Sequence, residues 1–335
     1  MTTQPMSPGA GPEADRWFVD HGLPWFVPER RASAHKALHS RQTLVGLALI
    51  AVAALALGVV LALLADEVSL APATMVTLTA LVAALYAGRR LGAWPIAKWA
   101  IGRTMRSLRM LFPMVTRALP LLLLFMTFLF VNAEVWQVSA TLDGAVLWVT
   151  VLLFIGIAGG FLLARLPEEL DHVDREVDAA TVVQVCRGTP LAAYAQSVME
   201  DLGTQHKLTE QTRVHGLERT NLLLVLMVTQ AVQVVLLAAS VFGFFVIFGA
   251  VIMTQGVQKT WIGDQPTALP LATNLSVELL QVSVFLAAFS GLYFTVYAVT
   301  DDTYRDQFFT DIKAELERAV GVRAVYLAAR ADASG

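Results

Sequence analysis

Long runs of apolar residues alternate with short charged connections along this chain. Six runs approach or exceed the roughly 20 mostly apolar residues that a helix needs to cross a membrane. They cover residues 43–64, 70–87, 118–136, 144–164, 222–253 and 275–299. The pattern therefore predicts an all-α integral membrane protein with about six transmembrane helices. The fifth run is longer than one span requires, so we expect it to tilt, to break near Gly243 or Gly249, or to extend beyond the bilayer.

Lysine and arginine are distributed unevenly among the connections. Five to seven basic residues lie in each of the segments 1–41, 89–117, 165–219 and 300–335. At most one lies in each of the segments 65–69, 137–143 and 254–270. Because basic connections tend to stay in the cytoplasm, the alternation predicts three transmembrane hairpins in a bacterial plasma membrane, with both termini cytoplasmic. The first run should act as an uncleaved signal-anchor.

This organisation divides the chain into seven segments. We expect a cytoplasmic arm, a first transmembrane hairpin, a basic amphipathic cytoplasmic helix, a second transmembrane hairpin, a cytoplasmic helical hairpin, a third transmembrane hairpin and a cytoplasmic amphipathic tail. In that order they are 1–41, 42–88, 89–117, 118–165, 166–220, 221–300 and 301–335.

The composition agrees with a membrane protein and offers little chemistry. Of the 335 residues, 56% are hydrophobic and 15% are charged, whereas a soluble domain carries about 25% charged residues. A net charge of −3 indicates no nucleic-acid partner. The single cysteine, Cys186, has no metal-ligand spacing around it, and the sequence has no common nucleotide-binding, zinc-protease or hydrolase motif. We therefore expect no cofactor, no metal and no enzymatic activity.

A basic helix is predicted between Pro95 and Pro113. Its four bases fall within an arc of roughly 140°, opposite most of its apolar residues, if the residues advance by 100° each. These bases are Lys98, Arg103, Arg106 and Arg109. The pattern is typical of a helix that lies on anionic lipid headgroups. Alternatively, the bases only enforce topology, and the face of Ile101 and Met105 packs on neighbouring helices.

The arm carries two aromatic pairs, Trp17-Phe18 and Trp25-Phe26. Exposed aromatic residues at this density are unusual unless an interface covers them. One interpretation is a docking element for a partner or for lipid headgroups. The other is that the pairs pack on the cytoplasmic helices of the same chain.

Polar residues inside the apolar runs are the default functional candidates in a membrane protein. Glu278 and Gln281 share one helical face in the sixth run, as Gln230 and Gln233 do in the fifth. They could line a transport path. Alternatively, the glutamines form hydrogen bonds between helices, and Glu278 reaches water at the outer end of its span.

The cytoplasmic segment 166–220 carries an acidic face with Asp171, Asp174 and Asp178. Carboxylates at this spacing could bind a divalent cation or serve an enzyme. A solvated acidic face is the alternative that we favour, since one rigid helix rarely surrounds an ion.

Two stretches, WFVDHGLPWFVP (Trp17–Pro28) and YAVTDDTYRDQFF (Tyr297–Phe309), resemble a loosely defined set of actinobacterial integral membrane proteins. That set has no assigned activity, so the resemblance carries over no functional residue. The distinctive residues lie in the predicted cytoplasmic parts, which favours a membrane scaffold or assembly protein that holds membrane-protein partners or a second copy of itself. The alternative is a transporter or channel with a polar path near Glu278, Gln230 and Gln233.

Overall fold

The computed structural model describes residues 10–38, 41–65, 70–142, 144–176, 178–202, 214–270, 274–300 and 302–334. Apart from an isolated bridge between Ala268 and Ser276, these residues form helices, turns and loops. The prediction of an all-α membrane protein is confirmed. The helices α3, α4, α7, α11 and α13 are long and apolar enough to cross a membrane. Their bounds are Arg41–Ala65, Leu70–Arg90, Gly144–Glu176, Gly216–Ile252 and Val277–Thr300.

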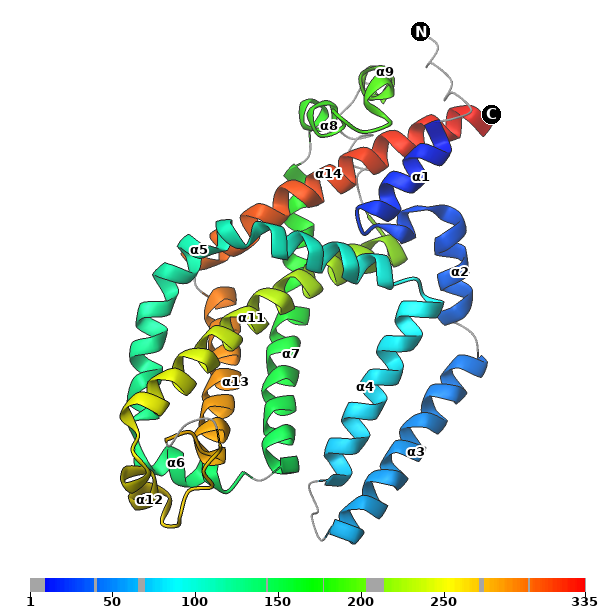
Figure 1. Ribbon diagram of the computed structural model, residues 1–335. Helices are drawn as coiled ribbons and strands as arrows, with labels where there is room; N and C mark the ends of the chain where they lie inside the picture. Colours follow the sequence, from blue (N-terminus) through cyan, green and yellow to red (C-terminus); the bar gives the residue numbers. More distant parts are fainter. Residues whose placement is uncertain are drawn as a thin grey trace.

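A bent pair of helices supplies up to a sixth crossing. The end of α5 (Trp94–Phe130) and the short α6 (Ala133–Ala140) pass the same test together, and they meet at an angle of 74°. Asn132 sits in the bend, where its side chain accepts a hydrogen bond from Glu134 N and caps α6. In Figure 1 the chain passes between the two ends of the bundle through α3, α4, α5, α7, α11 and α13 in turn, which agrees with three hairpins.

The predicted basic helix and the third predicted span are one helix. The sequence places a boundary at Pro113, but α5 continues from Trp94 to Phe130. In Figure 1 it first runs across the upper end of the bundle and then turns down along it. Pro113 and Pro120 lie inside this helix. An interior proline removes one backbone hydrogen bond and bends a helix, so the predicted helix end is a bend instead.

Two other helices also cross the predicted segment boundaries. α7 continues through Pro167 to Glu176, and α11 begins at Gly216. The 37 residues of α11 make it about 55 Å long, well beyond a hydrocarbon core of about 30 Å. The helix runs diagonally through the bundle (Figure 1). The helix has no break at Gly243 or Gly249, which leaves tilt and extension beyond the bilayer as the two expectations that fit its length.

The remaining helices gather mainly at one end of the bundle. We call it the terminal side, because α1 and α14 lie there, at the top of Figure 1, and we call the other end the opposite side. The terminal side holds α1, the 3-10 helix η1, α2, α8, α9 and α14, with bounds Ala10–Asp20, Pro24–Phe26, Pro28–Leu38, Ala179–Val185, Ala192–Leu202 and Asp302–Ser334. The opposite side holds α6 and α12 (Gln255–Ile262).

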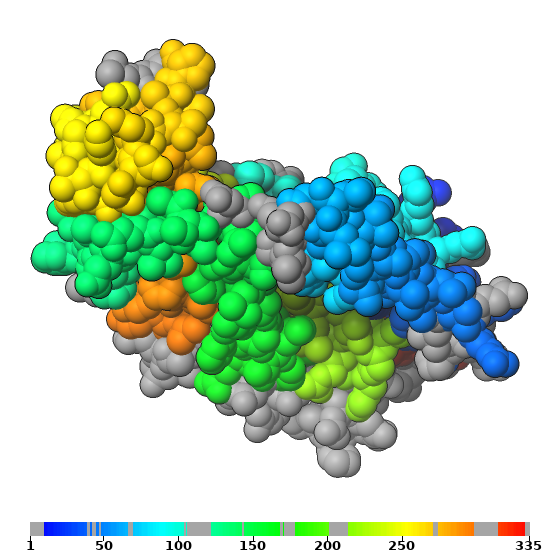
Figure 2. Space-filling model, turned by 90° about the horizontal axis from the view of Figure 1, so that it is seen from below, coloured from blue at the N-terminus to red at the C-terminus, as the bar shows by residue number. Residues whose placement is uncertain are grey.

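One buried apolar cluster extends through the bundle from the terminal side to the opposite side. It includes Phe18 of α1 and Tyr326 of α14 as well as Phe130, Trp136 and Phe245. The α3–α4 hairpin lies outside this cluster, beside α7 (Figure 2). Trp148 Nε1 of α7 donates a hydrogen bond to Thr77 Oγ1 of α4 at 2.7 Å. Many apolar side chains of the hairpin are therefore exposed, and its two helices pack mainly on each other.

Gly58 sets the distance between α3 and α4. A Cβ atom at this position would lie 2.7 Å from the carbonyl oxygen of Ala71 and 3.0 Å from its Cα. We expect Gly58→Val to force the helices apart and to lower the free energy of unfolding by about 2 kcal/mol through overpacking. Thermal melting in detergent measures this loss.

The matched control is Gly46→Val in the same helix, where a Cβ would have nothing within 4 Å. Equal melting temperatures for the two variants would contradict the close approach of α3 and α4 at Gly58.

Candidate functional site

Glu218 joins three elements that are far apart in the sequence. It lies in the first turn of α11 and is 2% exposed. One carboxylate oxygen accepts a hydrogen bond from Arg31 Nη1 of α2. The other accepts from Arg323 of α14, with Nε at 2.9 Å and Nη2 at 2.7 Å. A buried carboxylate is tolerated when it is paired in this way, so Glu218 fastens the arm and the tail to α11.

Asn221, almost one turn further along α11, binds the backbone of the arm. Its Oδ1 accepts a hydrogen bond from Trp25 N at 3.0 Å, and its Nδ2 donates to Gly22 O at 2.8 Å. Gly22 has a φ of +74° and packs against the Trp99 side chain of α5, a conformation and a spacing that suit glycine. Trp25 Nε1 donates to Leu91 O, just before α5, at 2.7 Å. The turn of the arm is thus held between α11 and the start of α5.

A second polar group joins the arm to α14. Tyr326 donates a hydrogen bond to Asp15 at 2.6 Å, and Arg330 donates to the Tyr326 oxygen at 2.6 Å and to Glu29 at 2.8 Å. Burial and the Asp15 carboxylate raise the pKa of Tyr326 to about 12. The hydrogen bond from Arg330 lowers the pKa of Glu29. Together with the contacts of Glu218, these residues join α1, α2 and α14 to α11 on the terminal side. We call these joined helices the platform.

The aromatic pairs of the arm form the apolar part of this junction. Phe18, Trp25 and Phe26 are buried. Phe18 stacks on Phe26 at a centroid distance of 5.6 Å and meets Tyr326 edge-on at 5.3 Å. Their contacts are internal, which corrects the docking interpretation in favour of the packing alternative. Trp17 is half-buried, and it stacks on His21 and lies under the guanidinium of Arg318.

The predicted basic face of α5 is divided. Arg103 pairs with Glu315 of α14 at 3.0 Å, whereas Lys98 is exposed. Ile101 and Met105, predicted on the packing face, are exposed on the side of Lys98. Ile96 and Ala100 are buried instead, because α5 turns the Arg103 side toward α14. The side chains of Arg106 and Arg109 lie outside the described residues.

The intramembrane polar candidates do not form one site. Glu278 accepts hydrogen bonds from Thr267 N at 3.0 and 3.1 Å, and Gln281 Nε2 donates to Leu142 O at 3.3 Å. These hydrogen bonds fix two loops on the opposite side, the one between α12 and α13 and the one between α6 and α7. Gly249 of α11 packs on Leu279, the neighbour of Glu278. Gln230 precedes Gly249 by 19 residues, which is about 28 Å along the helix.

Gln230 and Gln233 lie further toward the terminal side on α11. Gln230 is completely buried, and neither atom of its amide has a hydrogen-bond partner in the described part of the chain. The Oε1 atom of the half-buried Gln233 also has none there. An unsatisfied buried amide costs stability, and within the described spans Gln230 is a fully buried residue whose whole amide has no visible structural role.

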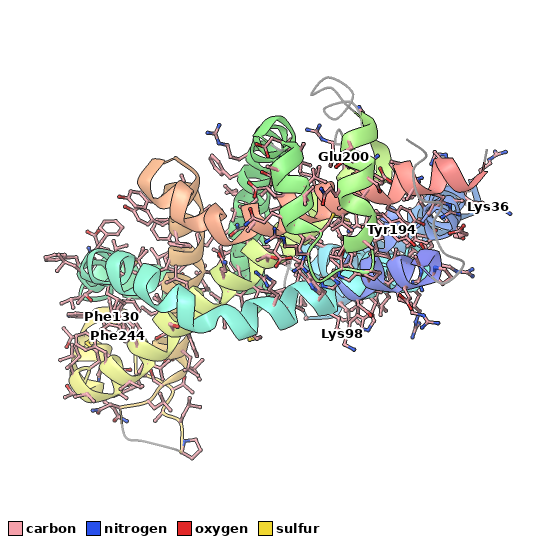
Figure 3. All side chains as sticks on the ribbon, turned by 90° about the horizontal axis from the view of Figure 1, so that it is seen from above. Lys36, Lys98, Phe130, Tyr194, Glu200 and Phe244 are labelled. Atoms are coloured by element: carbon pink, nitrogen blue, oxygen red, sulfur yellow. The ribbon has the colours of Figure 1, made fainter. Side chains whose placement is uncertain are left out.

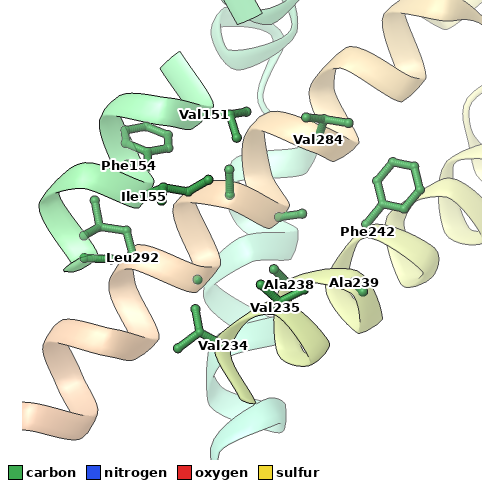
Figure 4. A pocket seen from close by; sticks show the side chains of 14 residues that line it. Val151, Phe154, Ile155, Val234, Val235, Ala238, Ala239, Phe242, Val284 and Leu292 are labelled. Carbon is green, nitrogen blue, oxygen red and sulfur yellow. The ribbon is translucent and has the colours of Figure 1, made fainter. Parts of the chain in front are cut away.

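An apolar groove of about 350 Å³ opens between α7, α11 and α13 (Figure 4). Phe154 and Ile155 of α7, Val235 and Phe242 of α11, and Leu292 of α13 line it with other apolar residues. The groove lies within three candidate membrane spans. It offers a surface for hydrocarbon and no group for acid–base or metal chemistry.

The acidic helix face does not form a metal site where it is described. Asp178 caps α8 by accepting a hydrogen bond from Thr181 N at 2.7 Å, and hydrogen bonds with the side chain and then the backbone of Thr181 lower the pKa of Asp178. The side chains of Asp171 and Asp174 lie outside the described residues. Within the described residues, no group of three or more His, Cys, Asp or Glu side chains is placed to hold a metal ion. Cys186 is buried against α14, and burial raises the pKa of its thiol to about 12.

Sequence reasoning missed Glu218, Asn221 and Arg323. Glu218 and Asn221 are three residues apart at the start of the fifth apolar run, so they share a helical face. An acid and an amide on the same face as Leu222 and Val225 signal a buried polar contact. The sequence has no signal that pairs this face with Arg31 and Arg323, because those residues come from other helices.

Removing the charge of Glu218 tests the junction. Glu218→Gln leaves two arginines facing a neutral amide, and breaking a buried ion pair costs about 3 kcal/mol. We expect a lower melting temperature in detergent and faster proteolytic cleavage in the arm. The matched control is Glu29→Gln. Its carboxylate is 65% exposed, so the loss should stay below about 1 kcal/mol. Equal effects of the two substitutions would contradict the central role of Glu218.

Comparison of the chain with protein-family models, with curated proteins and with solved structures gives no match. The functional assignment therefore rests on the residues of this chain and their geometry.

Proposed function

We propose that this multi-pass membrane protein is a non-enzymatic scaffold or assembly protein whose terminal side lies in the cytoplasm of a bacterial plasma membrane. The observation that carries the proposal is the junction at Glu218. It binds α2, α11 and α14 together, so the helices outside the membrane form a fixed platform. A fixed platform presents its surface to a partner without the entropic cost of ordering it.

The outward side of this platform offers a place for a partner. Ala195 and Val198 of α9 are buried, as is Leu191 just before it, whereas Gln196 and Glu200 of α9 are exposed. Figure 3, viewed from the terminal side, shows α9 in front of α14 with Glu200 near its end. We expect a membrane-associated protein or a second copy of the chain to bind this side. Lys98 and Trp94 on α5 are placed to contact anionic lipid headgroups.

A transporter or channel is the second candidate, and the observation that favours it is Gln230. A buried amide without a visible partner is more typical of a residue that lines a polar path than of a residue that only packs between helices. Two observations weaken this candidate. Gln230 lies far along α11 from the part of the helix that packs beside Glu278, and Glu278 and Gln281 form hydrogen bonds with loop residues on the opposite side.

Two variants separate the candidates. In a scaffold, the double substitution Gln196→Arg/Glu200→Arg should remove at least one protein that co-purifies with the wild type in mild detergent, without lowering the melting temperature. Gln230→Leu should keep the same co-purifying proteins and leave stability unchanged or higher, because it removes an unsatisfied amide. Ion flux in proteoliposomes that Gln230→Leu abolishes would favour the transporter, and unchanged co-purification with the double variant would contradict the scaffold at this surface.

The orientation is tested by reporter fusions. A periplasmic reporter such as alkaline phosphatase should be active when fused after Lys259, and a cytoplasmic reporter such as green fluorescent protein should be fluorescent when fused after Gly188. Basic connections on the terminal side support this direction. The reverse pattern of activity would contradict it.

A further inference from the structure

An open cavity of about 610 Å³ lies between α2 and the start of α11, on the terminal side. Arg31 and His35 line it from α2, and His215, Gly216 and Leu217 line it from α11. Glu218 lies against the same cavity, and it is the acidic residue among the described lining residues. The cavity thus adjoins the junction, and His35 and His215 line it beside Glu218.

The charges around the cavity favour an anion. Glu218 carries one negative charge and is shared by two arginines, so this group has a net charge of +1. His35 follows Arg31 by one helical turn on α2, which places both on the same side of the helix. His215 lies across the cavity at the start of α11. Arginine and histidine donors on two walls suit an anion with several oxygen atoms.

The first turn of α11 adds backbone donors to this wall. His215 is the N-cap residue, and its side chain makes no capping hydrogen bond. The first N–H groups of a helix have no intrahelical acceptor, and the helix dipole favours negative charge at this end. Gly216, Leu217 and Glu218, the first three residues of α11, all line the cavity.

We infer that this cavity binds a phosphate group, as a monoester or a diester. Its position indicates the phospholipid headgroup as the source: α11 begins a candidate membrane span at Gly216, and α2 leads directly into the spanning helix α3. The cavity therefore lies where headgroups meet the protein. A soluble phosphate compound has the same recognition chemistry and is the other source that an experiment must distinguish.

Two measurements on the full-length protein in detergent identify the ligand. Isothermal titration with inorganic phosphate tests the free anion. Native mass spectrometry with added phosphatidylglycerol, compared with the phosphate-free lipid monogalactosyldiacylglycerol, tests the headgroup. We expect retention of phosphatidylglycerol over the galactolipid. Binding of inorganic phosphate with no preference between the lipids would support the cavity with a soluble source, and no binding in either measurement would overturn the inference.

Three variants locate the site. His35→Gln and His215→Asp should each weaken binding about tenfold, the value of one charge-assisted hydrogen bond. The aspartate also caps α11, so His215→Asp should not lower the melting temperature, and its lost binding cannot come from unfolding. Lys36→Gln is the neighbouring control. Lys36 neighbours His35 but does not line the cavity, and it lies at the outer edge of the molecule in Figure 3. It should change binding less than twofold, and a loss equal to that of His35→Gln would overturn the location.

Discussion

The carboxylate of Glu218 imposes the strongest constraint on this protein. A charge that is almost fully removed from water must be compensated by nearby charge and hydrogen bonds, and here both come from other helices. Arg31 arrives from the arm and Arg323 from the tail. The arrangement of α2, α11 and α14 follows from that requirement. Asn221, the turn at Gly22 and the Tyr326 group then fix the arm in the same place.

The membrane part is held by a different kind of contact. Apolar helices gain little from contact with each other in lipid, so close packing and small residues decide their association. Phe130 stacks on Phe245 at 4.8 Å, and Gly249 packs against Leu279. These contacts join α5, α11 and α13. In the α3–α4 hairpin the two helices approach each other closely at Gly58, but the hairpin makes few contacts with α7. The α3–α4 hairpin is therefore the part of the membrane bundle that is most weakly joined to the other helices.

This distribution bears on function. Glu278 and Gln281 lie in the spans toward the opposite side, and their hydrogen bonds stabilise loops between helices there. In the described part of the chain, Gln230 forms no hydrogen bond with either loop. The polar groups that meet across the sequence lie at the membrane boundary on the terminal side, next to a cavity lined by arginine and histidine. The binding of proteins and of phosphate-bearing lipid at that boundary is the activity that we propose for this arrangement.

Hydrophobic length alone determined the membrane class, the all-α fold and the positions of α3, α4, α7, α11 and α13, because a spanning helix satisfies its own backbone hydrogen bonds. The length of the fifth apolar run also indicated a helix longer than one span requires. The sequence could not show that α5 continues through Pro113, since interior prolines end some helices and bend others. Nor could it place Phe18, Trp25 and Phe26 in the core or pair Glu218 with Arg31 and Arg323. Those facts belong to the tertiary structure, because each depends on which distant helix supplies the matching surface or charge.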